Sequence, residues 1–149
     1  MNRLPLVLFT SAVLLAGPAL SQTPSTVTVE ITFSEKALAE LTSRGEAVTV
    51  SGYWMGDPAP GATLPVNEIG TIFLLTEDLT LWPGPVTVTL GSALASAPVD
   101  QVVEPMLNVN VYSARWTSDD NLLDCGLVDD LLSKLTAAPQ KMQCKLIGE

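Results

Sequence analysis

The segment Thr26–Phe33, with the sequence TVTVEITF, alternates strictly between polar and apolar residues. The valines, the isoleucine and the phenylalanine fall on one face, while Glu30 and the threonines fall on the other. Alternation with a period of two, rich in β-branched residues, is typical of a strand with one buried face. This segment therefore predicts a β-strand that packs one side against a core.

Similar apolar stretches recur along the chain between turn signals. Glycines and prolines are densest in the loop Gly56–Pro65 and in the WPGP segment Trp82–Pro85, and such residues favour turns. Further strands are expected at residues 46–55, 69–75, 79–81, 86–90, 107–112 and 140–147.

Two stretches have helical spacing instead. Ser34 is placed to cap a short helix that Gly45 ends. Apolar residues at 127, 128, 131, 132 and 135 share one helical face, and Pro139 stops that pattern. The ambiguous region 92–105 has room for a short helix around 99–103.

Closely spaced strands without regular strand–helix–strand alternation favour an antiparallel architecture over a parallel sheet. The expected fold is mainly β: an antiparallel β-sandwich, immunoglobulin-like or transthyretin-like, of about seven strands. It should carry one short early helix and one C-terminal helix before the last strand. No linker or repeat divides residues 22–149, so these are expected to form a single domain.

Residues 1–21 have the three parts of a secretory signal peptide. Arg3 gives a positive start, residues 4–16 are mostly apolar, and the small residues Ala19 and Ser21 precede a cleavage point before Gln22. The apolar run is shorter than the roughly 20 residues that a membrane-spanning helix needs. The sequence therefore predicts a periplasmic or extracellular protein, with no membrane insertion after cleavage.

The charge balance bears on the class of partner. Removal of Arg3 with the signal leaves six cations against sixteen carboxylates, a net charge of −10. Such a chain repels phosphate backbones, so no nucleic-acid partner is expected.

Cys125 and Cys144 are the only cysteines. In an exported chain a pair of this kind predicts a disulfide. Two lone thiols without any histidine lack the ligand set of a zinc site and the usual imidazole partner of a catalytic cysteine.

The residues that several common kinds of active or binding site require are absent from this sequence. Without histidine there is no Ser-His-Asp triad, and the glycines do not have the spacing of a phosphate-binding loop. The carboxylates of Asp119, Asp120 and Asp124 fail the spacing of an EF-hand calcium loop and suit the first turn of a helix better. We expect no metal, no cofactor and no catalytic residue.

Aromatic side chains give the best candidates for binding. Tyr53 and Trp54 precede the Gly/Pro loop that contains Asp57, Trp82 opens a turn, and Trp116 follows a strand. Aromatic residues at loop edges can form a platform for a sugar or a partner protein. The alternative is that these tryptophans belong to the core of a small sandwich.

These observations favour a non-catalytic binding module for a protein or carbohydrate partner, without indicating its oligomeric state. The loop from Gly56 to Pro65 and its flanking aromatic residues are the expected contact surface, because surface loops often carry contacts and prolines lower the entropy lost on binding. Two other functions stay open. One is a small hydrolase that uses carboxylates around Asp57 or Asp119–Asp124, and the other is a secreted enzyme inhibitor that inserts the loop.

The signal peptide yields a direct prediction. Mass spectrometry of the protein recovered from its native compartment should find a new N-terminus near Gln22. A mature form that retains Met1 to Leu15 would contradict the signal-peptide interpretation.

Overall fold

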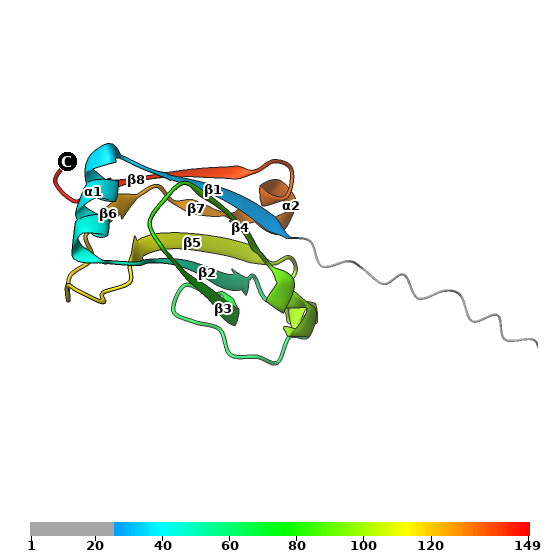
Figure 1. The fold of residues 1–149 in the computed structure, drawn as a ribbon. Helices are drawn as coiled ribbons and strands as arrows, with labels where there is room; N and C mark the ends of the chain where they lie inside the picture. Colours follow the sequence, from blue (N-terminus) through cyan, green and yellow to red (C-terminus); the bar gives the residue numbers. More distant parts are fainter. Residues whose placement is uncertain (1–25) are drawn as a thin grey trace, which may run out of the picture.

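The computed structural model describes residues 26–149 as two four-stranded sheets packed face to face (Figure 1). The predicted β-sandwich is confirmed, with eight strands rather than about seven. The predicted signal peptide, residues 1–21, lies outside the described residues.

The first sheet is formed by strands from both ends of the described chain. Its order is β4 (Val86–Leu90), β1 (Val27–Phe33), β8 (Gln140–Leu146) and β6 (Leu123–Cys125). β1 and β8 run parallel, and the other pairs of this sheet are antiparallel. The purely antiparallel expectation thus fails at one pair, because the first and last strands lie side by side in the same direction.

The second sheet is antiparallel throughout. Its order is β3 (Ile72–Leu81), β2 (Val48–Gly56), β5 (Met106–Ser113) and β7 (Val128–Leu131). The two short strands expected at 69–75 and 79–81 form the single strand β3. A register shift between Trp54 and Met55 marks a bulge against β3.

Apolar side chains from both sheets form the core. The largest fully buried ones include Trp54, Ile31, Leu41, Ile72, Leu90, Leu107 and Met142. The predicted disulfide is confirmed: Cys125 and Cys144 occupy paired positions on β6 and β8 and are bonded to one another. None of the helices among residues 26–149 is long and apolar enough to cross a membrane.

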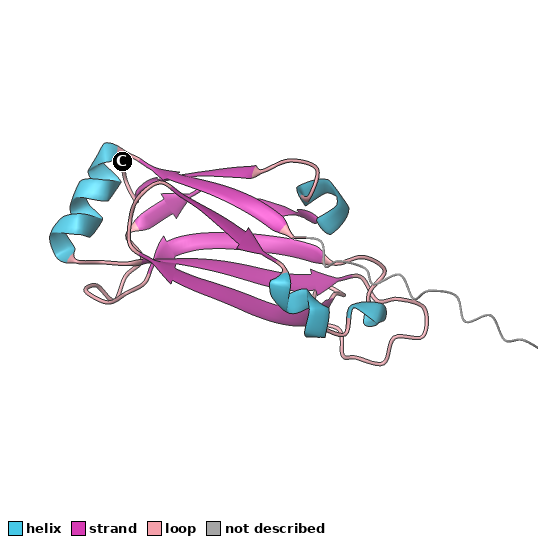
Figure 2. Cartoon of the chain, turned by 45° about the vertical axis from the view of Figure 1, so that its right-hand side comes forward, coloured by secondary structure: helices cyan, strands magenta, loops and turns pink. Residues whose placement is uncertain are grey.

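The first helix forms as its sequence predicts. α1 (Glu35–Arg44) begins after Ser34, whose hydroxyl accepts a hydrogen bond of 3.0 Å from the amide of Ala37. It ends at Gly45, whose φ of 66° lies in the left-handed region. α1 lies at one end of the sandwich, and the short helices lie at the other (Figure 2).

The expected C-terminal helix is mostly a strand. Val128–Leu131 forms β7 by pairing with β5, and only Leu132–Leu135 makes a helical turn, α2. Hydrogen bonds to the edge of a sheet outweigh a helical spacing of leucines here, because tertiary pairing can override local pattern. The short helix expected near 99–103 is the 3₁₀ turn η2 (Val99–Gln101), which follows the 3₁₀ helix η1 (Ser92–Ser96).

Gly56, the last residue of β2, packs closely against Val102 and Glu104. A Cβ at Gly56 would meet the carbonyl oxygen of Glu104 at 2.6 Å and Cβ of Val102 at 2.8 Å. We expect Gly56→Ala to lower the free energy of unfolding by about 1–3 kcal/mol, because the backbone must shift. Chemical denaturation measures this difference. Gly126→Ala is the control, since no atom lies within 4 Å of its added Cβ. Equal stability of the two variants would contradict the close approach.

Candidate functional site

The five predicted binding residues do not form one site. Trp82 and Trp116 meet at the α1 end of the sandwich, with ring centroids 5.6 Å apart. Trp54 is buried in the core, and Tyr53 and Asp57 lie elsewhere on the surface. The exposed tryptophan pair is therefore the part of the predicted site that the structure brings together.

The register of β2 explains why residues 34 positions apart in sequence meet. Val48, the first residue of β2, pairs with Leu81 on one side and with Ser113 on the other. Trp82 follows Leu81 directly, and Trp116 comes shortly after Ser113. Both tryptophans therefore follow strands, β3 and β5, whose last residues lie at the same end of the second sheet on either side of β2.

The two indoles are exposed and perpendicular. Trp82 is 67% and Trp116 is 60% exposed, and their rings meet at 90° in an edge-to-face contact. Edge-to-face contact is favourable for aromatic pairs. Most of the surface of both indoles stays accessible to water. Large exposed aromatic residues in contact are a feature of binding surfaces.

A buried carboxylate holds the loop that carries Trp116. The side chain of Glu46, fully buried just before β2, accepts hydrogen bonds from the amides of Trp116 at 3.0 Å and Thr117 at 2.7 Å. The Thr117 hydroxyl donates a third bond, of 2.6 Å. The amide of Ala114 also donates to the carbonyl of Ala47 at 2.8 Å. Glu46 therefore fixes the backbone from which the Trp116 indole projects.

The charge of Glu46 is stabilised by these contacts. Burial by itself raises the pKa of Glu46, but the hydrogen bonds from the Thr117 hydroxyl and from the amides of Trp116, Thr117 and Ala47 outweigh it. The pKa of this carboxyl consequently lies below its ordinary value. Glu46 is ionised at neutral pH and clamps the loop as a carboxylate.

Arg115 and Glu46 also belong to this site, although neither is among the binding residues predicted from the sequence. Arg115 has a φ of 61°, the single positive φ among non-glycine residues of the described chain. The left-handed region costs a residue with a Cβ about 1–2 kcal/mol. In the sequence, Glu46 could have been noticed as a charged residue just before a buried strand. Arg115 could have been noticed because it precedes Trp116.

Tyr53 belongs to a different surface, on the side of β2 that faces away from the core. Its ring lies 4.9 Å from the ring of Phe73, which is 46% exposed. Tyr53 is five positions along β2 from Val48, or about 16 Å at the rise of a strand. Trp54, the next residue, points into the core, where its indole N–H donates to Glu77 at 3.3 Å. Tyr53, the buried Trp54 and the other two tryptophans therefore do not lie on one continuous aromatic surface.

Asp57 begins the Gly/Pro loop at the opposite end of the sandwich. This loop is held against the η2 segment: the Val103 amide donates to the Asp57 carbonyl at 2.9 Å, and the Ala59 amide donates to the Gln101 carbonyl at 2.9 Å. The Gln101 side-chain oxygen accepts from the Thr63 amide at 2.8 Å. Exposed aliphatic side chains occur in these two segments and in the residues that follow each of them, namely Leu64, Val66, Ile69, Val99 and Val103.

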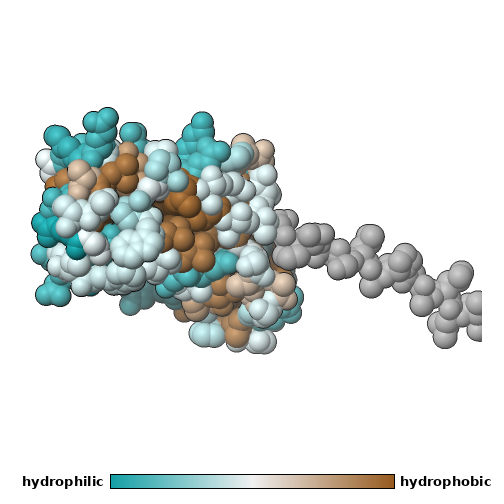
Figure 3. Space-filling model, in the orientation of Figure 1, coloured by the Kyte–Doolittle hydropathy of each residue, from teal (hydrophilic) through white to brown (hydrophobic). Residues whose placement is uncertain are grey.

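The space-filling view locates apolar surface on one face of the molecule (Figure 3). Apolar colour gathers at the centre, over β4 and its border with β3, and at the lower right near the loop end. β3 and β4 are the edge strands of their sheets, and Leu79, Leu81 and Val86 are only partly buried there. The side of the sandwich between these two edges is thus incompletely covered.

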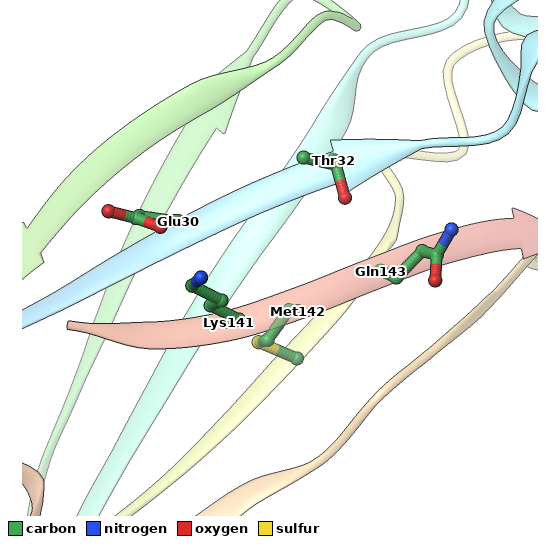
Figure 4. Close-up of a pocket in the computed structure, with 5 residues that line it drawn as sticks. All are labelled: Glu30, Thr32, Lys141, Met142 and Gln143. Atoms are coloured by element: carbon green, nitrogen blue, oxygen red, sulfur yellow. The ribbon is translucent and has the colours of Figure 1, made fainter.

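A shallow hollow of about 450 Å³ lies on the outer side of β1 and β8 (Figure 4). It is lined by Glu30, Thr32, Lys141, Met142 and Gln143. Glu30 is the single acidic residue among the five. The hollow therefore lacks the pair of carboxylates that acid–base hydrolysis of a glycoside requires.

The acidic residues considered for calcium do not gather into a site. Asp124, on β6, lies 3.6 Å from the ammonium of Lys145, while Asp119 and Asp120 are exposed in the loop after Trp116. Among residues 26–149, no three His, Cys, Asp or Glu side chains come together in a group that could hold a metal ion.

The Glu46 clamp gives a prediction about stability and pH. We expect Glu46→Gln to lower the free energy of unfolding by about 2 kcal/mol at pH 7, because charge-assisted hydrogen bonds are replaced by weaker ones. A carboxyl with a lowered folded pKa stabilises the protein above its unfolded pKa, and this contribution is lost as the pH falls through the folded value. The difference between the two proteins should therefore shrink below pH 4.5, the ordinary value.

Denaturant titrations across this pH range measure the effect. Glu40→Gln is the control, because Glu40 forms an exposed ion pair with Arg44 on α1 and such pairs contribute little. If the two variants have the same stability at every pH, the clamp does not exist.

Comparison of the chain with family models, with curated proteins and with solved structures gives no match. Its function is therefore inferred from its own residues, namely the exposed pair Trp82 and Trp116 and the buried Glu46 that holds the backbone of Trp116.

Proposed function

We propose that this protein is an exported, non-catalytic β-sandwich module that binds a partner through Trp82 and Trp116. The observation that carries the proposal is the contact between two indoles that are each more than half exposed. Water-exposed aromatic surface of this size gains free energy when a partner covers it. Tryptophan is also among the residues that contribute most to protein interfaces.

The clamp at Glu46 supports the same function. A surface whose backbone is already fixed loses little conformational entropy when it binds. Both oxygens of the buried carboxylate hold the amides on which Trp116 depends. The Trp116 loop is therefore prepared for contact before a partner arrives.

Two further observations support a location outside the cytoplasm. The Cys125–Cys144 disulfide is typical of proteins in oxidising compartments. The first 21 residues have the pattern of a signal peptide. We place the protein in the periplasm or the extracellular space.

The Gly/Pro loop is the second candidate surface, as a contact loop or as the inserting segment of an inhibitor. Leu64, Val66 and Ile69 are exposed in this region, and hydrogen bonds to Gln101 brace its backbone. It lacks an exposed tryptophan, so we rank it below the tryptophan pair. The hollow on β1 and β8 holds a single carboxylate, Glu30, so it does not favour the hydrolase.

A capture experiment with two matched variants tests the two surfaces. The mature chain, residues 22–149, serves as bait for the envelope and secreted fractions of its source cells. We expect Trp82→Ala/Trp116→Ala to retain at most a tenth of the captured partner, a loss of about 1.4 kcal/mol. The variant should stay folded because both side chains are mostly exposed.

The comparison variant is Ile69→Ser/Val103→Ser, which removes two exposed apolar side chains at the loop end. It should retain capture. The opposite result, with capture lost only in this variant, would move the contact surface to the loop. Undiminished capture by both folded variants would refute the assignment of either surface.

A further inference from the structure

Arg115 combines three features that no other described residue shares. It is exposed, it directly precedes Trp116, and its backbone has a φ of 61°. The three ion pairs of residues 26–149 use Arg44, Lys134 and Lys145, so the Arg115 guanidinium takes part in none of them.

The fold does not require an arginine at this position. A glycine would adopt the left-handed conformation without the steric cost of a Cβ. The side chain of Arg115 forms none of the hydrogen bonds found in residues 26–149, while the next two amides are held by Glu46. The clamp therefore maintains a strained backbone at Arg115, whose guanidinium is in no ion pair and whose neighbour in the chain is the exposed Trp116.

We propose that Arg115 is the third member of the contact surface and that it binds a carboxylate of a polypeptide partner. The inference rests on the proposed function, because the two tryptophans supply the apolar part of the contact. A guanidinium binds a carboxylate through two parallel hydrogen bonds, which fixes the orientation of the partner. Arginine and tryptophan together are the composition of strongly contributing residues at protein interfaces.

Few cations of this acidic chain lie outside ion pairs. Residues 26–149 carry six cations and sixteen carboxylates, and three of the cations are already in ion pairs. The other three are Lys36 on α1, Lys141 on β8 and Arg115, so Arg115 is the unpaired cation of the loop that carries Trp116. Physiological salt screens charges beyond about 8 Å, so the local pairing decides for a single carboxylate.

The indole N–H signals of the three tryptophans provide the assay. The blocked tetrapeptides LDLE and LNLQ, which differ only in their two carboxylates, are titrated into the isotope-labelled mature protein, with cellotetraose as a third probe. We expect LDLE to shift the signals of Trp82 and Trp116 and to leave that of the buried Trp54 unchanged. LNLQ should bind at least tenfold more weakly.

Two variants distinguish the effect of the Arg115 side chain on binding from its effect on stability. Arg115→Gly should melt at or above the temperature of the natural protein and lose the preference for LDLE over LNLQ. Arg44→Ala removes a cation that already pairs with Glu40 and should keep the preference.

Four results would overturn the inference: equal binding of the two peptides, a preference that survives in Arg115→Gly, stronger binding of cellotetraose, or no indole shift with any probe. If capture still depends on Trp82 and Trp116 in these cases, the proposed function stands and the role of Arg115 fails. If capture is independent of both tryptophans, the proposed function fails with it.

Discussion

Strand β2 pairs along nearly its whole length with β3 on one side and β5 on the other. Alternation along this strand sends Trp54 into the core and Tyr53 to the outer face. Its first residue, Val48, aligns the ends of both neighbours, so Trp82 and Trp116 leave the sheet together. A slip of one residue in the pairing of β2 with either neighbour would turn that neighbour's core-facing residues outward and displace Trp82 relative to Trp116. The exposed tryptophan pair is therefore a consequence of the same register that buries the core.

Glu46 links this register to the surface. It lies between the end of α1 and the start of β2, and its amide donates to the carbonyl of Leu41 at 2.9 Å. A buried carboxylate is costly unless it is hydrogen-bonded, and here the loop after β5 supplies three donors. Binding of these donors by Glu46 also satisfies loop amides that would otherwise need water. The ionised form thus stabilises the fold and orders Trp116 through the same contacts.

Local patterns predicted most of the fold, because alternation in β1 and the caps of α1 are properties of adjacent residues. They failed at residues 128–131, where leucine spacing favoured a helix and pairing with β5 formed a strand. The contact between Trp82 and Trp116 depends on which strands are neighbours, and Glu46 bonds to residues about 70 positions away. The partners in these contacts cannot be read from adjacent residues, even where a single residue such as Glu46 stands out as a charge beside a buried strand. Trp54 is an error of the opposite kind. It lies beside a loop in the sequence, which suggested a binding residue, but its position on β2 points its side chain into the core.

The acidity of the chain explains how apolar groups remain exposed at both ends of the molecule. Sixteen carboxylates against six cations make copies of residues 26–149 repel one another, which opposes association through exposed indoles. The long edge strand β3 also carries the exposed residue Asp78, and charges at a sheet edge oppose pairing with other strands. The proposed partner meets the same net negative charge where it carries carboxylates. Arg115, the residue before Trp116, is the unpaired cation of the loop after β5, and in the proposed contact it offsets this repulsion locally.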